Sequence, residues 1–313
     1  MATTKSLTRR KAGGTLGAIQ RSIGYLQGGY KSNAGVNNVH SEVQLFNTTT
    51  QTGSIVYDTG YQRYYTPGLS GNHYGYFSIN TNVDFNRFSY ISATASASFQ
   101  MAQYPQVTVS DFGIYSTGWV VCSSTGPGYG PWAATSWSKI PFTTESVVNY
   151  GSLSTSPQGT TRQGASSGLC GIFMNTDYTG LTILNFATEA LTSNAGDSSL
   201  LNSAVQIPCG MSHLDNSAVY FVGLMPFNMK ISLVGSTITA LSQQTKFTYN
   251  FGESHSITTN TSGYMMAGYS DTTGRYDMGQ HALCQKITFS NNSITTLPDL
   301  VMAQSSGQMM QGF

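Results

Sequence analysis

Side chains that could act as catalysts or metal ligands are few and scattered in this sequence. Only Glu253 and His255 stand two apart on one expected strand, where alternate side chains point the same way. A zinc site needs three or four converging ligands, and the sequence has no such cluster. The polar segment from Asp271 to His281 could hold a cation through Asp271 and Asp277, but it lacks the spaced carboxylates of a calcium loop. We therefore expect no metal and no other cofactor.

Nucleophiles and catalytic motifs are equally sparse. The sequence contains no Gly-x-Ser-x-Gly elbow, phosphate-binding loop or His-Glu-x-x-His helix motif. The cysteines form no Cys-x-x-Cys pair and have no histidine at ligand spacing, so we expect buried free thiols at Cys122, Cys170, Cys209 and Cys284. We predict that the protein is not an enzyme.

Positive charge is concentrated at the start of the chain. Residues 1–41 hold six of the 14 Lys and Arg and no acid, which leaves eight cations against 13 Asp and Glu afterwards, or net charges of +6 and −5. We expect a basic N-terminal arm over residues 1–20. The arm is either a solvated tail or a docking segment for a partner. In the second case its contacts would be Lys5, Arg9, Arg10 and Lys11. Three contiguous cations are too few to indicate nucleic acid.

Four further cations share one position in a repeat, three residues before an aligned large residue: Arg87, Lys139, Lys230 and Lys286. Two interpretations are open. The cations pack their apolar stems between neighbouring elements and keep the charge near water, or they form a ring around one mouth of a central channel and attract an anionic ligand or partner. In two other repeats Val43 and Ile183 take this position and interrupt the ring.

Aromatic residues stand out in the loop GPGYGPWAATSW, from Gly126 to Trp137. Tyr129 and Trp132 lie there between turn-forming residues. A large amphipathic ring on a loop suits stacking on a carbohydrate or contact with a protein. Alternatively, Trp132 closes a gap between two structural elements.

A six-fold repeat of paired strands would position these side chains. The first strand of each pair starts at Gly24, Gly75, Gly113, Gly168, Ala218 and Gly263. The second strand ends near a large residue, namely Phe46, Tyr90, Phe142, Phe186, Leu233 and Phe289. Strands repeating about every 40 to 50 residues, without helical periodicity, are typical of propeller blades. We predict an all-β fold, a six-bladed β-propeller of four-stranded antiparallel blades, over residues 21–313.

The C-terminal segment supplies a strand without a blade of its own. Met302 to Gln304 repeats the Met-Ala-Gln of Met101 to Gln103, which precedes an expected inner strand. We therefore expect residues 305–313 to form the inner strand of the first blade. Closing the ring with strands from both termini removes free edges. Removing this segment is predicted to destabilise the whole ring.

The composition fits a rigid body with a polar but weakly charged surface. Only 9% of the residues are charged, against about 25% in an average globular protein. No stretch approaches the roughly 18 apolar residues of a membrane helix, and no secretion signal begins the chain. We expect synthesis in a cytoplasm and no membrane association.

The repeats also resemble a known family. A Gly-Tyr-rich strand such as GYLQGGY from Gly24, followed by KITFSNNSIT from Lys286 or SKIPFTTESV from Ser138, is similar to the kelch-like repeats of β-propeller virion structural proteins of tailed bacteriophages. The likeness covers residues 20–313. It implies a non-enzymatic particle component in the tail, neck or fibre apparatus.

Two functions follow as expectations. In the first, the chain is a virion protein anchored through its arm to other virion structural proteins, in a symmetric assembly of several copies. In the alternative, it is a lectin-like propeller that recognises a glycan on the host surface through loops such as the one with Tyr129 and Trp132.

Overall fold

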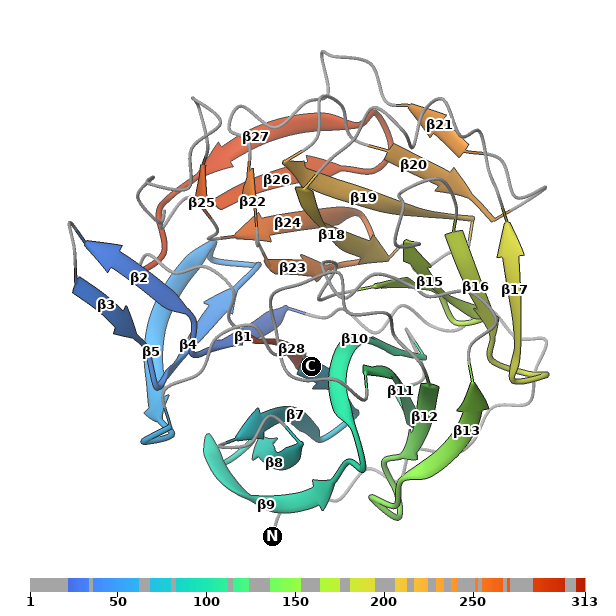
Figure 1. Cartoon of the computed structure of the whole chain (residues 1–313). Coiled ribbons are helices and arrows are strands. Elements are labelled where there is room, and N and C mark those ends of the chain that lie inside the picture. Colours follow the sequence, from blue (N-terminus) through green and yellow to red (C-terminus); the bar gives the residue numbers. More distant parts are fainter. Residues whose placement is uncertain are drawn as a thin grey trace, which may run out of the picture.

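The structure is a computed structural model, and every regular element among its described residues is a β-strand. It describes residues 22–33, 36–61, 68–79, 83–111, 115–123, 136–152, 164–174, 181–194, 206–212, 217–224, 229–233, 238–240, 251–252, 255–266, 269–270, 284–301 and 308–312. Four-stranded antiparallel sheets, six in all, surround a common centre as the blades of a propeller (Figure 1). The predicted fold class is confirmed.

The strands of each blade are given from the ring axis outward. Blade 1 holds β28 (Gln308–Gly312), β1 (Ile23–Gln27), β4 (Glu42–Asn47) and β5 (Thr52–Asp58). Blade 2 holds β6 (Gly68–Ser70), β7 (Tyr74–Ile79), β8 (Asp84–Ser89) and β9 (Thr94–Gln100). Blade 3 holds β10 (Tyr104–Ser110), β11 (Thr117–Ser123), β12 (Ser136–Pro141) and β13 (Val148–Ser152).

The second half of the ring follows the same order. Blade 4 holds β14 (Ala165–Ser166), β15 (Cys170–Met174), β16 (Leu181–Asn185) and β17 (Ala190–Asn194). Blade 5 holds β18 (Gln206–Ser212), β19 (Ala218–Leu224), β20 (Met229–Ser232) and β21 (Ile238–Ala240). Blade 6 holds β23 (His255–Thr258), β24 (Ser262–Met266), β26 (Cys284–Thr288) and β27 (Ser293–Leu297).

Both ends of the described chain meet in blade 1. The C-terminal β28 pairs antiparallel with β1, from Ile23 opposite Gly312 to Gln27 opposite Gln308. Inner strands also contact one another all the way round, and β28 lies between β23 of blade 6 and β6 of blade 2. The prediction that the C-terminal segment closes the ring is therefore confirmed.

Glycines on the second strand of a blade let the neighbouring blade come close. A Cβ on Gly24 would lie 1.8 Å from Cδ1 of Ile257, and one on Gly171 would lie 2.6 Å from Cγ2 of Val109. Ile257 and Val109 belong to the inner strands of the preceding blades. The repeated glycine is thus a packing requirement between blades, since a Cβ there would overlap a core side chain.

Register corrects two of the predicted strand starts. Gly24 lies opposite Phe46, and the equivalent pairs in blades 3 and 4 are Gly118 with Ile140 and Gly171 with Leu184. The second strands of these blades begin at Thr117 and Cys170, so Gly113 and Gly168 were the wrong glycines. In both segments two glycines stand a few residues apart, and composition does not distinguish them.

The large residues were aligned correctly except in blade 1. Tyr90, Phe142, Phe186, Leu233 and Phe289 directly follow the third strands of their blades. The equivalent residue in blade 1 is Thr48, and Phe46 stands two residues earlier. A shift of two residues keeps the same face of a strand, so alternation alone could not detect the error.

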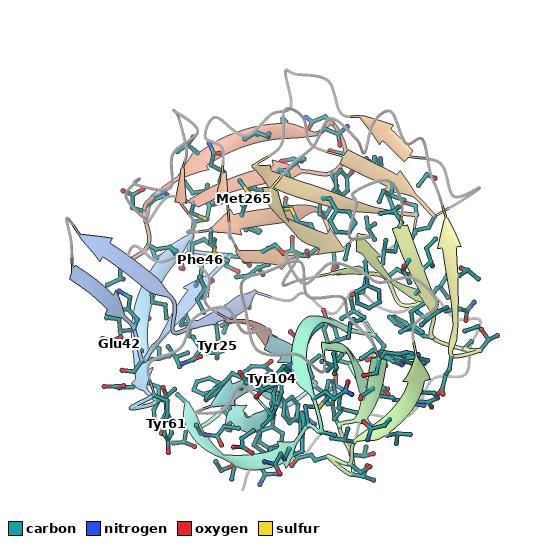
Figure 2. The ribbon with its side chains drawn as sticks, viewed as in Figure 1. Tyr25, Glu42, Phe46, Tyr61, Tyr104 and Met265 are labelled. Atoms are coloured by element: carbon teal, nitrogen blue, oxygen red, sulfur yellow. The ribbon has the colours of Figure 1, made fainter. Side chains whose placement is uncertain are left out.

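Aromatic stacking joins neighbouring blades. The four aromatic residues that directly follow third strands each stack on an aromatic ring in the second strand of the preceding blade. The ring centroids are 4.1 to 5.1 Å apart in the pairs Tyr25–Tyr90, Tyr76–Phe142, Trp119–Phe186 and Tyr220–Phe289. In blade 1, Tyr25 packs toward blade 2 while Phe46 packs toward blade 6 (Figure 2). The hydrophobic core therefore lies between the sheets, where each blade buries both of its faces.

The two faces of the ring differ in their connections. In an antiparallel blade the connections from first to second strand and from third to fourth strand reach the same face. None of these exceeds the six residues of 111–116 and 142–147, so we call this face the turn face. All other connections reach the opposite, loop face, and the longest spans residues 267–283. Two small two-stranded sheets lie on the described parts of the loop-face connections. One is the hairpin of β2 (Tyr30–Asn33) and β3 (Val36–Val39), and the other pairs β22 (Phe251–Gly252) with β25 (Tyr269–Ser270) from two different connections.

Candidate functional site

The four aligned cations lie on the third strands of their blades, with the inner and second strands between them and the ring axis. Each stands opposite an aromatic residue of the second strand, in the pairs Arg87–Tyr76, Lys139–Trp119, Lys230–Tyr220 and Lys286–Tyr264. In blade 1 the equivalent residue is Leu45, opposite Tyr25, and not Val43. In blade 4 it is Ile183, as predicted. This placement favours packing between blades over a ring at a channel mouth.

Arg87 is paired with a carboxylate of the next blade. Its Nη1 lies 3.2 Å from Oε1 of Glu145. The same Oε1 accepts a hydrogen bond from the Tyr76 hydroxyl at 3.2 Å, and Oε2 of Glu145 accepts one from the Ser98 hydroxyl at 2.8 Å. Burial, and then the charge of Glu145, raise the pKa of the Tyr76 hydroxyl well above its usual value. One carboxylate of blade 3 thus holds three side chains of blade 2.

Lys139 repeats this arrangement one blade further on. Its ammonium pairs with Glu189 of blade 4, and the Tyr150 hydroxyl donates to the same carboxylate. These two hydrogen bonds, that of Lys139 first, hold the pKa of Glu189 below its usual value. Glu145 and Glu189 have φ angles of 51° and 54°, and each is the last residue of a turn segment, Phe-Thr-Thr-Glu or Phe-Ala-Thr-Glu.

The other two cations lie against aromatic rings. Nζ of Lys230 is 5.6 Å from the ring centroid of Tyr220, and Nζ of Lys286 is 5.9 Å from that of Tyr264. Both distances allow attraction between the cation and the ring face. The Tyr220 hydroxyl donates to Oδ1 of Asn292 in blade 6 at 3.2 Å. All four cations therefore have a carboxylate or an aromatic ring as neighbour.

Sequence reasoning missed the carboxylates and tyrosines of these contacts. The turns that end in Glu145 and Glu189 are nearly identical in sequence, so comparing turns could have identified the pair. Their partners, however, lie in the preceding repeat. Aligning repeats compares equivalent positions and does not reveal which neighbours touch.

Asp111 is a buried carboxyl that sequence reasoning also missed. It begins the turn from β10 to β11, where Oδ2 accepts from the Ser116 hydroxyl at 2.6 Å and Oδ1 accepts from the Thr117 amide at 3.0 Å. Burial raises the pKa of Asp111 to about 6, and these hydrogen bonds oppose the rise. The arrangement closes a turn and holds no reacting group beside it.

Histidines and carboxylates do not gather in the part of the chain that the structure describes. There, no group of three or more His, Cys, Asp or Glu side chains is placed to hold a metal ion. His40 contacts only one acid, with Nδ1 3.3 Å from Oε2 of Glu42. Glu253, Asp271 and Asp277 lie outside the described residues, and nothing is described of the side chain of His255 in β23.

The cysteines agree in part with the prediction of buried free thiols. Cys122 and Cys284 are free and buried, whereas free Cys170 is half-buried. Burial raises the pKa of the Cys122 thiol to about 12, so the thiol stays protonated and unreactive at neutral pH. The side chain of Cys209, in β18, is outside the description.

The predicted arm and aromatic loop are attached to opposite faces of the ring. Lys5, Arg9, Arg10 and Lys11 lie outside the described residues, but β1 begins where β28 ends, which is on the turn face. Tyr129 and Trp132 also lie outside them, in the connection 124–135 that leaves β11 and returns to β12 on the loop face. Neither set of side chains is located by the structure.

The architecture defines a six-bladed β-propeller, and solved structures with the same fold exist. One is a chain of the crystal structure of a nidogen/laminin complex, with a TM-score of 0.61, 6% sequence identity, and coverage of 93% of this chain and 98% of that one. Another is TolB from Acinetobacter baumannii, with a TM-score of 0.56, 11% identity, and coverage of 95% and 68%. At such identities the likeness concerns the fold alone.

Sequence comparisons add no relative. No protein-family model matches the chain, and no curated sequence matches it. Among the residues that the structure describes, none form a helix long and apolar enough to cross a membrane.

Proposed function

We propose that this protein is a non-enzymatic structural component of a tailed-phage virion, in the tail, neck or fibre apparatus, anchored through its basic arm to other virion proteins. The attachment of the arm supports the proposal most directly. Residues 1–20 precede β1, and blade 1 is already complete with β28, β1, β4 and β5. The four strands of blade 1 are thus supplied without residues 1–20, as a docking role for the arm requires.

Two further features support a structural role. Side chains link successive blades, as Glu145 does between blades 3 and 2 and Glu189 does between blades 4 and 3. The resemblance of the repeats to kelch-like virion proteins supplies the particle setting. Four cations and no acid in residues 1–20 favour an acidic protein surface as the anchor.

The proposal is tested by removing residues 1–20 and measuring how much protein is incorporated into purified particles. We expect at least a tenfold loss of incorporation while the thermal midpoint of the purified ring is unchanged, because the four strands of each described blade come from residues 23–312. The matched variant Arg9→Gln, Arg10→Gln, Lys11→Gln, which keeps the length of the arm, should reproduce most of the loss. Full incorporation of the truncated chain, or absence of the intact chain from particles, would refute the proposal.

The alternative function, binding of a host-surface glycan, has one specific observation in its favour. The connection that contains Tyr129 and Trp132 starts at the end of β11 and returns at the start of β12, both on the loop face, whereas β1 begins on the turn face. On this view Tyr129→Ala with Trp132→Ala abolishes binding to a glycan array, whereas Tyr61→Ala, at an exposed tyrosine outside this connection, does not. Binding that persists in the double variant excludes this loop as the site.

A further inference from the structure

Five of the six pairs of neighbouring blades share one kind of contact at the turn face. In each pair, the turn between the third and fourth strands of one blade accepts a hydrogen bond from the preceding blade. Backbone or amide oxygens accept it in three pairs, from the hydroxyls of Tyr25, Tyr220 and Tyr264. Carboxylate oxygens accept it in the other two pairs, at Glu145 and Glu189. We call all five cross-blade contacts.

Among the described contacts, only blade 3 is joined to both of its neighbours through a carboxylate. Its Glu145 is paired with Arg87 of blade 2, and its Lys139 is paired with Glu189 of blade 4. The pair of blades 4 and 5 has Ile172 at the tyrosine position, and most of the turn of blade 5 lies outside the described residues. In the three other cross-blade contacts the hydrogen-bonded groups carry no charge.

Both oxygens of Glu145 accept hydrogen bonds. Oε1 accepts from Arg87 and from the Tyr76 hydroxyl, the charged and titratable groups that blade 2 places against it. Oε2 accepts from the Ser98 hydroxyl. A proton on either oxygen would face a donor, and the carboxyl would no longer attract the guanidinium. Acid should therefore release the turn 142–147 from blade 2.

Glu189 likewise has one donor on each oxygen. Lys139 donates to Oε1, and the Tyr150 hydroxyl donates to Oε2. These two hydrogen bonds, that of Lys139 first, hold the pKa of Glu189 below its usual value. The stability that this contact gives is therefore complete above the pKa of an unfolded glutamate, about 4.3, and is lost as pH falls through the lowered value.

We propose that acid loosens both contacts of blade 3 at the turn face, by protonating Glu145 and Glu189, while the other cross-blade contacts hold. Those contacts end on backbone carbonyls and a side-chain amide, which remain acceptors in acid. The ring then opens first on either side of blade 3, as a local unit ahead of global unfolding. The proposal rests on the described contacts and is independent of the proposed function.

Asp111 is the one other described carboxyl at the turn face. Burial raises its pKa to about 6, so it already carries its proton at about pH 5, and this proton favours the folded turn. Comparing about pH 5 with about pH 2.5 therefore separates Asp111 from the two glutamates. The remaining described carboxyls lie at loop-face ends of strands or in loop-face connections: Glu42, Asp58, Asp84 and Asp299.

Equivalent amides report on the turn of every blade. The residue directly after each third strand donates its amide to the carbonyl of the residue directly before the second strand, with the nitrogen and oxygen 2.6 to 3.3 Å apart. These donors are Thr48, Tyr90, Phe142, Phe186, Leu233 and Phe289. Phe142 and Phe186 begin the turns that hold Glu145 and Glu189, so their amides should lose protection when the carboxylates are released.

Hydrogen exchange of these amides in the full chain, followed by NMR, tests the proposal. Between about pH 5 and about pH 2.5, protection relative to unstructured peptides at the same pH should fall at least about tenfold at Phe142 and Phe186. At Thr48, Tyr90 and Phe289 it should change by less than about threefold. An equal loss at all five amides, or no loss at Phe142 and Phe186, would overturn the proposal.

Glutamine imitates the protonated carboxyl because it is neutral and carries a donor in place of one oxygen. Glu145→Gln should lower the protection of Phe142 and leave that of Phe186 unchanged, already at about pH 5. Glu189→Gln should have the opposite selectivity. The variant with both substitutions should lose the dependence on pH at both amides. If that dependence persists, the proposal is wrong.

An uncharged contact provides the matched control. Tyr220→Phe removes the hydroxyl that donates to Asn292, so it should lower the protection of Phe289 by the same factor at both pH values. Retained protection at Thr48 shows that each variant is folded. A Tyr220→Phe effect that grows in acid as steeply as the loss at Phe142 would also overturn the proposal, because the uncharged contacts would then respond to acid as well.

Discussion

Single residues at the ends of tight turns hold neighbouring blades together. The fourth residue after the third strand has a positive φ of 51° to 58° in the five blades where it is described: Gln51, Ala93, Glu145, Glu189 and Asn292. This conformation is uncommon for residues other than glycine, and it closes the short turn. In three of the turns the side chain also reaches the preceding blade. Turn geometry thereby positions the groups that bind across blades.

Asp111 provides a prediction about pH at this scale. Its pKa is about 6 in the folded protein, above the value of about 3.9 expected when unfolded, so the folded state binds the proton more tightly. The stabilising contribution is complete below pH 4 and is lost as pH rises through 6. Relative to Asp111→Asn, the free energy of unfolding of wild type should fall by about 2 kcal/mol between pH 4 and pH 7.

Chemical denaturation across that pH range measures the difference. Asparagine keeps the oxygen that accepts from the Thr117 amide but does not titrate, which makes it a matched control. Parallel pH profiles of the two proteins would contradict the raised pKa of Asp111.

At the scale of strands, the second strands of blades 1, 3, 4 and 6 each carry a glycine that leaves room for the preceding blade. A Cβ on Gly24 would lie 1.8 Å from Cδ1 and 2.4 Å from Cγ1 of Ile257, which is fully buried. Gly24→Ala should therefore lower the free energy of unfolding by about 3 kcal/mol or more.

A second substitution tests the cause of that loss. Ile257→Ala removes both atoms that the new methyl group would overlap, so the double variant should be clearly more stable than the sum of the single losses predicts. Denaturant unfolding of the four proteins gives this interaction free energy. Strict additivity would mean that Gly24 acts through something other than contact with Ile257.

Much of this strand arrangement could be predicted from the sequence, and there are physical reasons why the rest could not. Glycine-led strands and their period predicted the number of blades. The repeated Met-Ala-Gln at residues 302–304 predicted a closing strand in residues 305–313, and the structure has it at residues 308–312. Gly113 and Gly118 stand in one segment, so the sequence did not show that Gly118 is the glycine of the second strand. Because side chains alternate with a period of two, the sequence also did not show that Phe46 stands two residues before the equivalent position. Contacts such as Arg87 with Glu145 join side chains 58 residues apart, and no periodicity within a repeat indicates them.

At the scale of the whole molecule, the ring depends on the pairing of its two ends. β28 is the inner strand of blade 1 and touches the inner strands of blades 2 and 6. Deleting residues 305–313 would expose the edge of β1 and break both contacts at once. We expect the thermal midpoint to fall by at least about 10 °C. The deletion should lower the free energy of unfolding by several kcal/mol, and each kcal/mol shifts the midpoint of a large domain by about 2–4 °C.

Calorimetry of the chain without residues 305–313 checks this prediction. The control is the chain without residues 1–20, which keeps every described strand and should have the thermal midpoint of wild type. An unchanged midpoint after deletion of residues 305–313 would contradict closure by β28.

The central claim about the molecule is that a closed propeller serves as a building block of a tailed particle and is held there by its arm. A cryo-electron microscopy map of the purified particle tests it most directly. We predict a six-bladed ring in the tail, neck or fibre apparatus, with density for residues 1–20 running from blade 1 onto a neighbouring virion protein. A map that accounts for all of that apparatus without such a ring would contradict the claim.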